Sequence, residues 1–267
     1  MISPSGGSRR MIRDPHTGAD LRVLAIVPAR GGSKGLPRKN IARIADVSLI
    51  ARTARAVRAC DWIDGAVIST DDLEFAAEAR GEGLDMPALR PAELANDTAK
   101  GVDVWAHAWR EAEQTHGVRY DLSVYLQPTS PFRTPTHIHD TVSALLNGQH
   151  QAATTISQVP GHYAPQKTLT LDENGVLHFY TADGAKHSNR QTTAPTWTRN
   201  GLCYAARRAH VVDQGLICES DCGAVKIEGY VANIDDPEDL LIAQLLAEHG
   251  GYDILDQLAP AFKGQIT

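Results

Sequence analysis

The chain of 267 residues lacks any long hydrophobic run, since no stretch approaches the roughly 18 consecutive apolar residues of a membrane-spanning helix. Residues 1–20 are rich in Gly, Ser, Arg and Asp and contain no apolar segment, which argues against a signal peptide or membrane anchor there. We therefore expect a soluble protein without a membrane partner. We also expect residues 1–20 to be a disordered extension and residues 251–267 to be a weakly ordered tail.

Cysteine is scarce, with only Cys60, Cys203, Cys218 and Cys222 in the whole chain. They are scattered and form no C-x-x-C pair, so we expect no disulfide framework and favour a reducing cytoplasm as the location. Cys218 and Cys222 could ligate a metal, but the chain lacks the second pair of ligands that a structural zinc site requires.

An excess of positive charge is also missing. The chain carries 26 basic and 32 acidic side chains, a net charge of −6. This balance argues against a general nucleic-acid or membrane-surface binder, which would need a broad basic face. Any anionic ligand must therefore be bound by cations that are concentrated in one place.

Such a concentration follows the first apolar segment. Residues 23–27 are continuously hydrophobic, as expected of a buried strand. The loop after them contains Arg30, Lys34, Arg38 and Lys39, interleaved with Gly31, Gly32 and Gly35. Glycines let backbone amides approach an anion closely, and the cations supply counter-charge, so the loop suits a triphosphate. It matches neither the P-loop nor the dinucleotide-binding pattern, and a basic surface turn is the alternative interpretation.

Strands and helices then alternate along the chain. We expect strands at residues 65–70 and 122–126, and helices at 48–60, 71–80, 99–115 and 136–146. This order predicts an α/β fold with a mostly parallel sheet and right-handed crossovers. Ligands of such sheets bind beyond the carboxyl ends of the strands, where the basic loop, residues 86–98 and the loop after residue 126 would converge.

Several polar residues have two possible roles at this edge. Asp71 and Asp72 are expected to cap the helix that they precede, or else to belong to a site at the strand end. Asn96, Asp97 or Thr98 is a plausible N-cap for the helix that starts at residue 99.

The strand–helix rhythm breaks after a β-rich run at residues 153–159. Residues 168–180 alternate apolar side chains around Asn174-Gly175, which predicts a β-hairpin. We interpret residues 160–200 as an insertion, either a lid or a dimer arm. The core resumes at residues 201–206, with a short helical segment at 210–214 and strand material at 224–234. Residues 237–249 form a closing helix whose core-facing side chains are Leu240, Leu241, Ala243, Leu245 and Leu246.

The basic loop and the last strand together offer groups that could hold a triphosphate and a metal ion. Arg30, Lys34 and Lys39 could surround a triphosphate, with Ser33 and the loop amides assisting. Asp235 follows the last strand, where a carboxylate could hold Mg²⁺ among waters and phosphate oxygens. Its alternative role is to cap the closing helix, although Asp236 is also available for that.

The basic loop also carries a long motif. Residues 29–40 read A-R-x-x-S-K-G-L-P-x-K-N, which closely resembles the N-terminal motif of the acylneuraminate cytidylyltransferases (CMP-sialic acid synthetases). Further matching segments follow in order: STDD at 69–72, LRPAELANDTA at 89–99, LQPTSPFR at 126–133, RNG-x-x-Y at 199–204 and IDDPEDL at 234–240. The resemblance spans residues 22–249.

The resemblance implies a three-layer α/β/α Rossmann-like nucleotidyltransferase fold with a β-hairpin dimerisation insertion, a homodimer, and CTP and a 2-keto sugar acid as substrates. It implies one cytidylyltransferase domain over residues 21–250. The residues that it marks for CTP are Arg30, Gly31, Gly32, Ser33, Lys34, Lys39, Asn40, Arg90 as the cytosine reader, and Ala99. Those that it marks for the sugar acid are Gln127, Lys167, Arg190, Arg199 and Tyr204. Lys167 and Arg190 could instead be solvated cations. Arg30, Lys39 and Asp235 are the residues that we expect to act in catalysis.

One position departs from the family pattern. The family commonly ends its last strand with D-x-D as metal ligands, whereas this chain has Asn233 two residues before Asp235. An amide oxygen is a weaker Mg²⁺ ligand than a carboxylate. The sequence therefore predicts Mg²⁺ at Asp235 and Asn233 and leaves three alternatives open: one carboxylate is enough, Asn233 ligates through water, or the affinity for the metal is lowered. Two other functions stay open, namely the same transfer to another acceptor, such as an eight-carbon ketodeoxy acid or a phosphonate, and a non-catalytic nucleotide-binding protein.

Overall fold

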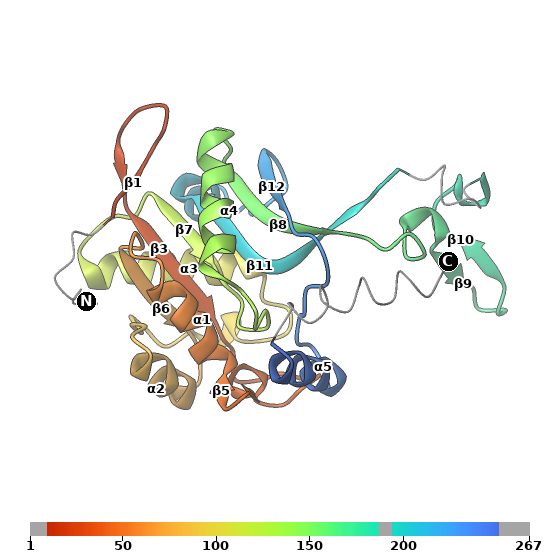
Figure 1. Cartoon of the computed structure of the whole chain (residues 1–267), viewed down its shortest axis with the longest axis horizontal. Coiled ribbons are helices and arrows are strands. Elements are labelled where there is room, and N and C mark those ends of the chain that lie inside the picture. The colour runs from red at the N-terminus through yellow and green to blue at the C-terminus, as the bar shows by residue number, and fades with distance from the viewer. Residues whose placement is uncertain (1–9, 187–193, 251–267) are drawn as a thin grey trace.

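A computed structural model describes residues 10–186 and 194–250. Its centre is a six-stranded sheet in the order β12-β8-β11-β7-β3-β6 (Figure 1). The strands are β3 (Val23–Pro28), β6 (Gly65–Ser69), β7 (Leu122–Tyr125), β8 (Ala152–Gln158), β11 (Trp197–Arg207) and β12 (Cys222–Lys226). β3 runs parallel to β6 and β7, and β8 runs parallel to β12. β11 is antiparallel to β7 and β8, so the predicted mostly parallel sheet is confirmed.

Helices cover both faces of this sheet. On one face, Val23, Ala25 and Val27 of β3 pack in one cluster with α1 (Leu49–Arg58), α2 (Leu73–Gly81) and α4 (Pro135–Asn147). On the other face, Leu24 and Ile26 pack with α3 (Gly101–His116) and the π-helical segment η6 (Ala209–Asp213). Successive side chains of a strand point to opposite faces, so a continuously apolar strand is buried on both. The predicted three-layer arrangement is confirmed.

The N-terminal segment forms a small β-hairpin, β1 (Ile12–Arg13) paired with β2 (Asp20–Leu21). Its turn is closed by buried Asp14, whose carboxylate accepts hydrogen bonds from the backbone amides of His16 and Thr17. Ile12 and Leu21 pack against the main core. The prediction of disorder for residues 1–20 is therefore wrong for residues 10–20, because the Asp14 turn brings two apolar side chains onto the domain. Residues 1–9 lie outside the described residues.

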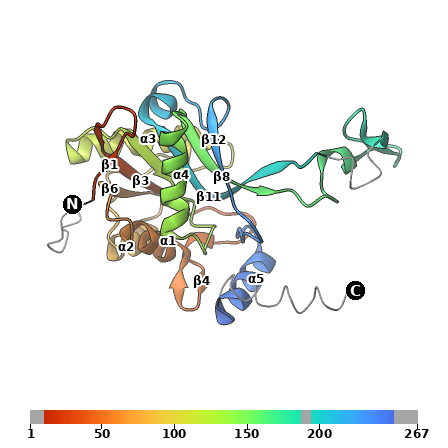
Figure 2. The ribbon, with the colours of Figure 1, turned by 45° about the horizontal axis from the view of Figure 1, so that its top comes forward.

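The predicted insertion connects β8 to β11 and extends away from the domain in two views (Figures 1 and 2). We call residues 159–186 and 194–196 the arm. It contains η3 (Pro165–Lys167), η4 (Gly184–Lys186) and the antiparallel pair β9 (Leu169–Leu171) and β10 (Leu177–Phe179). Gly175 turns the chain between these strands with φ at +79°, a left-handed conformation that suits glycine. The predicted hairpin is confirmed.

The closing helix is α5 (Pro237–Glu248). Ala243 belongs to a small core cluster with Ile234, Leu49 and Ile44, the last from the short strand β4 (Arg43–Ile44), which pairs with β5 (Val47–Ser48). The five apolar residues predicted to face the core do not all do so, because Leu241 and Leu245 are 56% and 49% exposed. The cluster is narrow, so it covers only one edge of the helix. The predicted tail from residue 251 lies outside the described residues, and no helix within them has the length and apolar character to cross a bilayer.

Candidate active site

A cavity of ≈ 510 Å³ opens at the carboxyl ends of β3 and β7, as expected for a parallel sheet. We call it the first cavity. Its wall includes most of the residues predicted for CTP and metal, namely Arg30, Ser33, Lys39, Asn40, Arg90, Ala99, Asn233 and Asp235. Beside it lies a second cavity of ≈ 360 Å³, lined by Arg199, Asn200, Gly201, Tyr204 and Tyr230 among others. Gln127 and Asn233 line both, so they stand where the two cavities meet.

The basic loop is held in place by hydrogen bonds from behind. The backbone amide of Gly31 donates to Oδ1 of Asp71 at 2.9 Å. Asn40 is buried, and its side-chain amide donates to the carbonyl oxygen of Arg30 at 3.1 Å. Asp72 alone caps α2, by accepting from the amides of Glu74 and Phe75. The two adjacent acids therefore divide the roles that the sequence left open, since Asp72 is the cap and Asp71 anchors the loop.

All four cations of the loop are paired with carboxylates, three of them with Asp97 or Asp235. Arg30 Nη2 lies 2.6 Å from Oδ1 of Asp97, and Lys34 Nζ lies 2.5 Å from Oδ2 of the same residue. Lys39 Nζ lies 2.8 Å from Oδ1 of Asp235. Lys34 and Arg30 hold the pKa of Asp97 below its usual value. The fourth cation, Arg38, pairs instead with Glu74 on α2.

Asp97 does not cap the following helix. α3 begins at Gly101, and its N-cap residue, Lys100, makes no side-chain capping hydrogen bond. The prediction that Asn96, Asp97 or Thr98 caps this helix is wrong, because the helix begins two residues later than the predicted start at residue 99. Asn96 instead closes a turn by accepting from the amide of Thr98. The family segment at residues 89–99 drew attention to this stretch, but its sequence alone did not indicate that Asp97 meets the basic loop.

The loop lies against the backbone of Asp235. A Cβ atom at Gly35 would overlap the carbonyl oxygen of Asp235, so this approach requires glycine. It brings the basic loop, near the start of the domain, to the segment after the last strand. Lys39 and Asp235 are thereby placed in contact.

Asp235 is free of the capping role that the sequence left open. Asp236 caps α5 in a reciprocal arrangement with Asp239. The Asp235 carboxylate receives Lys39 on Oδ1 and the side-chain amide of Asn233 on Oδ2, the latter at 2.7 Å. The amide oxygen of Asn233 is buried and has no hydrogen-bond partner in the described structure. A carboxylate beside an orphaned oxygen fits a hard divalent cation such as Mg²⁺, which takes oxygen ligands.

Arg90 forms part of the far wall of the first cavity. It is 5% exposed, and its Nε donates to Oγ of Ser69 at 3.0 Å while Nη2 donates to the carbonyl oxygen of Ser69. Burial lowers the pKa of this guanidinium. Two bonds to one residue fix the plane of the group, which suits recognition of a planar base edge.

An unsatisfied polar atom, the amide oxygen of Asn233, lies where the second cavity meets the first, and another, Oγ of Ser130, lies behind Gly201 of the second cavity. Gly201 turns with φ at +78°, and a Cβ atom there would lie 3.3 Å from Oε1 of Gln127 and 3.3 Å from Oγ of Ser130. Oγ of Ser130 is buried without a hydrogen-bond partner in the described residues, like the amide oxygen of Asn233. Buried polar atoms without partners are rare in proteins and mark places where a ligand or water binds.

Arg133 connects Gln127, which lines both cavities, to Gly201, which lines the second. It is buried, and burial lowers its pKa to about 10. Its guanidinium donates to the carbonyl oxygens of Gln127 (2.5 Å), Gly201 (3.3 Å) and Leu202, and to Oγ1 of Thr53. It thus fixes the loop after β7 against β11. The sequence placed Arg133 in a family segment without assigning it a role.

The two cations predicted in the insertion have separate outcomes. Lys167 lies in η3 of the arm and lines a third cavity of ≈ 390 Å³ together with Gln158, Ala164 and Pro195. It does not line the first or second cavity. Arg190 lies outside the described residues. A role of either residue in binding the sugar acid stays a prediction.

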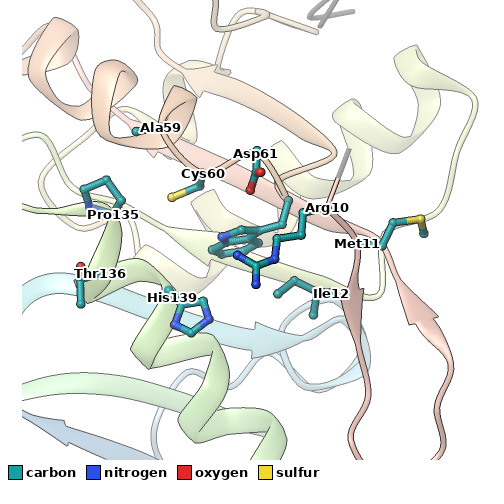
Figure 3. A pocket seen from close by; sticks show the side chains of 10 residues that line it. Arg10, Met11, Ile12, Ala59, Cys60, Asp61, Pro135, Thr136 and His139 are labelled. Atoms are coloured by element: carbon teal, nitrogen blue, oxygen red, sulfur yellow. The ribbon is translucent and has the colours of Figure 1, made fainter. Parts of the chain in front are cut away.

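Another pocket, of ≈ 330 Å³, lies between residues 10–12, the end of α1 and the start of α4 (Figure 3). The rings of Trp62 and His139 meet there edge to face, with centroids 6.3 Å apart. Burial raises the pKa of the Cys60 thiol to about 12, which leaves it a weak nucleophile. Within the described residues no group of three or more His, Cys, Asp or Glu side chains could hold a metal ion. We assign this pocket no function.

Comparisons with known proteins point to one family. A family model described as cytidylyltransferase matches residues 24–210. A CMP-N,N'-diacetyllegionaminic acid synthase of Legionella pneumophila is 38% identical over 197 residues, covering 72% of this chain and 81% of the relative. An N-acylneuraminate cytidylyltransferase of Escherichia coli is 32% identical over 189 residues, covering 71% of this chain. The chain spans only 43% of the length of that second relative.

The fold has relatives among solved structures. A CMP:2-keto-3-deoxy-manno-octonic acid synthetase complexed with CTP superposes with a TM-score of 0.63, covering 86% of this chain and 99% of the other. The sequence identity is 16%, so this likeness concerns the fold alone.

Proposed function

The chain belongs to the cytidylyltransferase family, and we propose that it joins CMP from CTP to a nonulosonic acid with release of pyrophosphate. One observation carries the proposal. A cavity walled by Arg30, Lys39 and Asp235 meets a second cavity at Gln127 and Asn233, so two substrates can be held side by side. The names of the two curated relatives, which act on sialic and legionaminic acids, support the acceptor class.

The transfer is an in-line displacement. The anomeric hydroxyl of the 2-keto acid attacks the α-phosphorus of CTP, the bond to the bridging oxygen breaks, pyrophosphate leaves, and the hydroxyl proton passes to solvent. Negative charge grows on the leaving pyrophosphate, next to Arg30, Lys34 and Lys39. Fixed cations in a cleft stabilise such charge without reorganisation. Positioning and charge neutralisation supply the rate, and no strong protein base is invoked.

Mg²⁺ is part of the proposal, with Asp235 and the amide oxygen of Asn233 as protein ligands. When bound, the ion would offset charge on the phosphate oxygens. One carboxylate is enough for a Mg²⁺ that shares its coordination with waters and substrate phosphates.

For the sugar acid we propose the second cavity, with Gln127, Tyr204 and the guanidinium of Arg199 in its wall. A cation there can pair with the acceptor's carboxylate. Lys167 belongs to the arm, and it would contribute only where an arm reaches a site. A role for Arg190, which lies outside the described residues, stays a prediction. Free thiols at all four cysteines agree with a reducing cytoplasm as the proposed location.

The proposal is tested by Mg²⁺-dependent pyrophosphate release from CTP with a panel of sialic, deaminated sialic, legionaminic, pseudaminic and eight-carbon ketodeoxy acids. We expect the highest kcat/KM with one of the nine-carbon acids. Turnover of the eight-carbon acid alone would reassign the acceptor. CTP binding without turnover of any acid would leave a non-catalytic nucleotide-binding protein.

We further propose that the arm pairs two copies of the chain in a homodimer. Leu171 pairs with Leu177 and Leu169 with Phe179, so all four side chains share one face of the hairpin. Each is 46–67% exposed, and an apolar face of this kind marks a protein interface.

Leu177→Glu is expected to convert the dimer to a monomer in sedimentation velocity, because a charge would be buried in the interface. Thr170→Glu is the matched control, since Thr170 is exposed on β9 and points to the opposite face of the hairpin. A wild-type protein that sediments as a monomer would contradict the proposal.

A further inference from the structure

Asp97 occupies the position that the proposed function gives to phosphate oxygens. One carboxylate oxygen contacts Arg30 at 2.6 Å and the other contacts Lys34 at 2.5 Å. A carboxylate that spans two cations presents the same charge and spacing of acceptor atoms as one edge of a phosphate group. The loop built for an anion therefore already holds one that belongs to the chain.

Asp97 has no evident task in the fold. It does not cap α3, which begins at Gly101. Its side chain is 42% exposed, and in the described structure the ion pairs recorded for it go to Arg30 and Lys34 alone. Asp71 and Asn40, not Asp97, anchor the backbone of the basic loop. The loop thus has its supports without Asp97.

We propose that Asp97 is an internal competitor for the triphosphate site, a positioning residue that leaves the cations when CTP binds and returns to them when pyrophosphate leaves. The inference rests on the proposed function. A ligand must exchange one carboxylate for several phosphate oxygens, so a polyanion displaces Asp97 more readily than a single phosphate does. The returning carboxylate favours dissociation of pyrophosphate. Of the two products, pyrophosphate carries more negative charge than the CMP-sugar and is therefore held more strongly by the cations.

The position of Asp97 links this exchange to the rest of the cavity. Leu94, Asn96 and Ala99 surround it in sequence and line the first cavity, as do Asp97 itself and Arg90. CTP can offset the lost ion pairs by contacts of its base and ribose with the wall, whereas pyrophosphate has neither group. The cost of displacing Asp97 is the same for both ligands, so pyrophosphate, which lacks these additional contacts, keeps the weaker net binding.

The test is direct binding of pyrophosphate and of CTP by isothermal titration calorimetry, without acceptor, to wild type and Asp97→Asn. We expect Asp97→Asn to tighten pyrophosphate binding about tenfold, the scale of two partly exposed ion pairs. Asp97→Glu keeps a competing carboxylate and should restore weaker binding. In turnover, Asp97→Asn should show stronger product inhibition by pyrophosphate.

Glu93→Gln is the matched control, because Glu93 is an exposed residue of η2 (Ala92–Leu94) and the change removes the same charge. Within the described residues Glu93 forms no ion pair with the basic loop. A second background, Lys34→Ala, removes one partner of Asp97, so the effect of Asp97→Asn should shrink there. Unchanged pyrophosphate affinity in Asp97→Asn, or equal tightening in Glu93→Gln, would overturn the inference. Failure of wild type to bind CTP would instead overturn the proposed function, so the two failures are distinguishable.

Discussion

Lys39→Ala is expected to lower the rate of pyrophosphate release from CTP and acceptor by about 10²–10³-fold, the scale of losing one preorganised group that stabilises transition-state charge. The side chain of Lys39 is only 14% exposed, and its ammonium lies 2.8 Å from Asp235, between the basic loop and the proposed metal ligands. A charge fixed at this point lies where the proposed function places the leaving pyrophosphate. Solvent cannot replace it, because water is a poorly ordered dipole in place of a full charge.

The variant should fold normally, since Lys39 lies in the short turn η1 (Lys39–Ile41) and not in the core. The measurements are a coupled pyrophosphate assay and the midpoint of urea unfolding. Arg58→Ala is the control, because Arg58 is an exposed cation on α1, far from the basic loop in sequence. Within the described residues it forms one ion pair, with Glu82 at 3.7 Å. A near-normal rate in Lys39→Ala with saturating CTP would remove the basic loop from the mechanism.

Asp235→Asn is expected to have an effect of similar size, with a loss of about 10²-fold or more and a higher Mg²⁺ requirement. Asp235 is the carboxylate that contacts Asn233, so its replacement leaves two neutral amides as the proposed ligand set. The measurement is kcat as a function of Mg²⁺ concentration at saturating CTP. Asp236→Asn is the matched control, because it removes the neighbouring charge while Asn can still cap α5.

Adding a carboxylate at the neighbouring proposed ligand should have the opposite effect on the Mg²⁺ requirement. Asn233→Asp restores the acidic pair of the family pattern and should lower the Mg²⁺ concentration at half-maximal rate, because a second carboxylate binds the ion more strongly. Mg²⁺ dependence that is the same in wild type, Asp235→Asn and Asn233→Asp would show that the ion binds elsewhere or is not needed.

Local pattern was sufficient for much of the fold. The apolar run of β3, the Asn174-Gly175 hairpin and the mostly parallel sheet were predicted because side-chain periodicity and turn chemistry act between near neighbours in the chain. The N-terminal hairpin was missed, since its two strands are only two residues long and depend on packing of Ile12 and Leu21 against the core. The exposure of Leu241 and Leu245 was missed for a related reason. How much of a helix is covered depends on the residues that pack against it, and the sequence of the helix does not specify them.

By itself, the sequence determined the family, the basic loop and the residue types around the first cavity, because these depend on a contiguous motif and on the order of the elements. Tertiary structure alone decided which carboxylate each cation meets. Asp97 pairs with Arg30 and Lys34 rather than capping α3, Asp71 anchors Gly31, and Asp236 leaves Asp235 to Lys39. These partners lie far apart in the chain, and the energy of a charge pair depends on distance through space, which only the folded backbone sets.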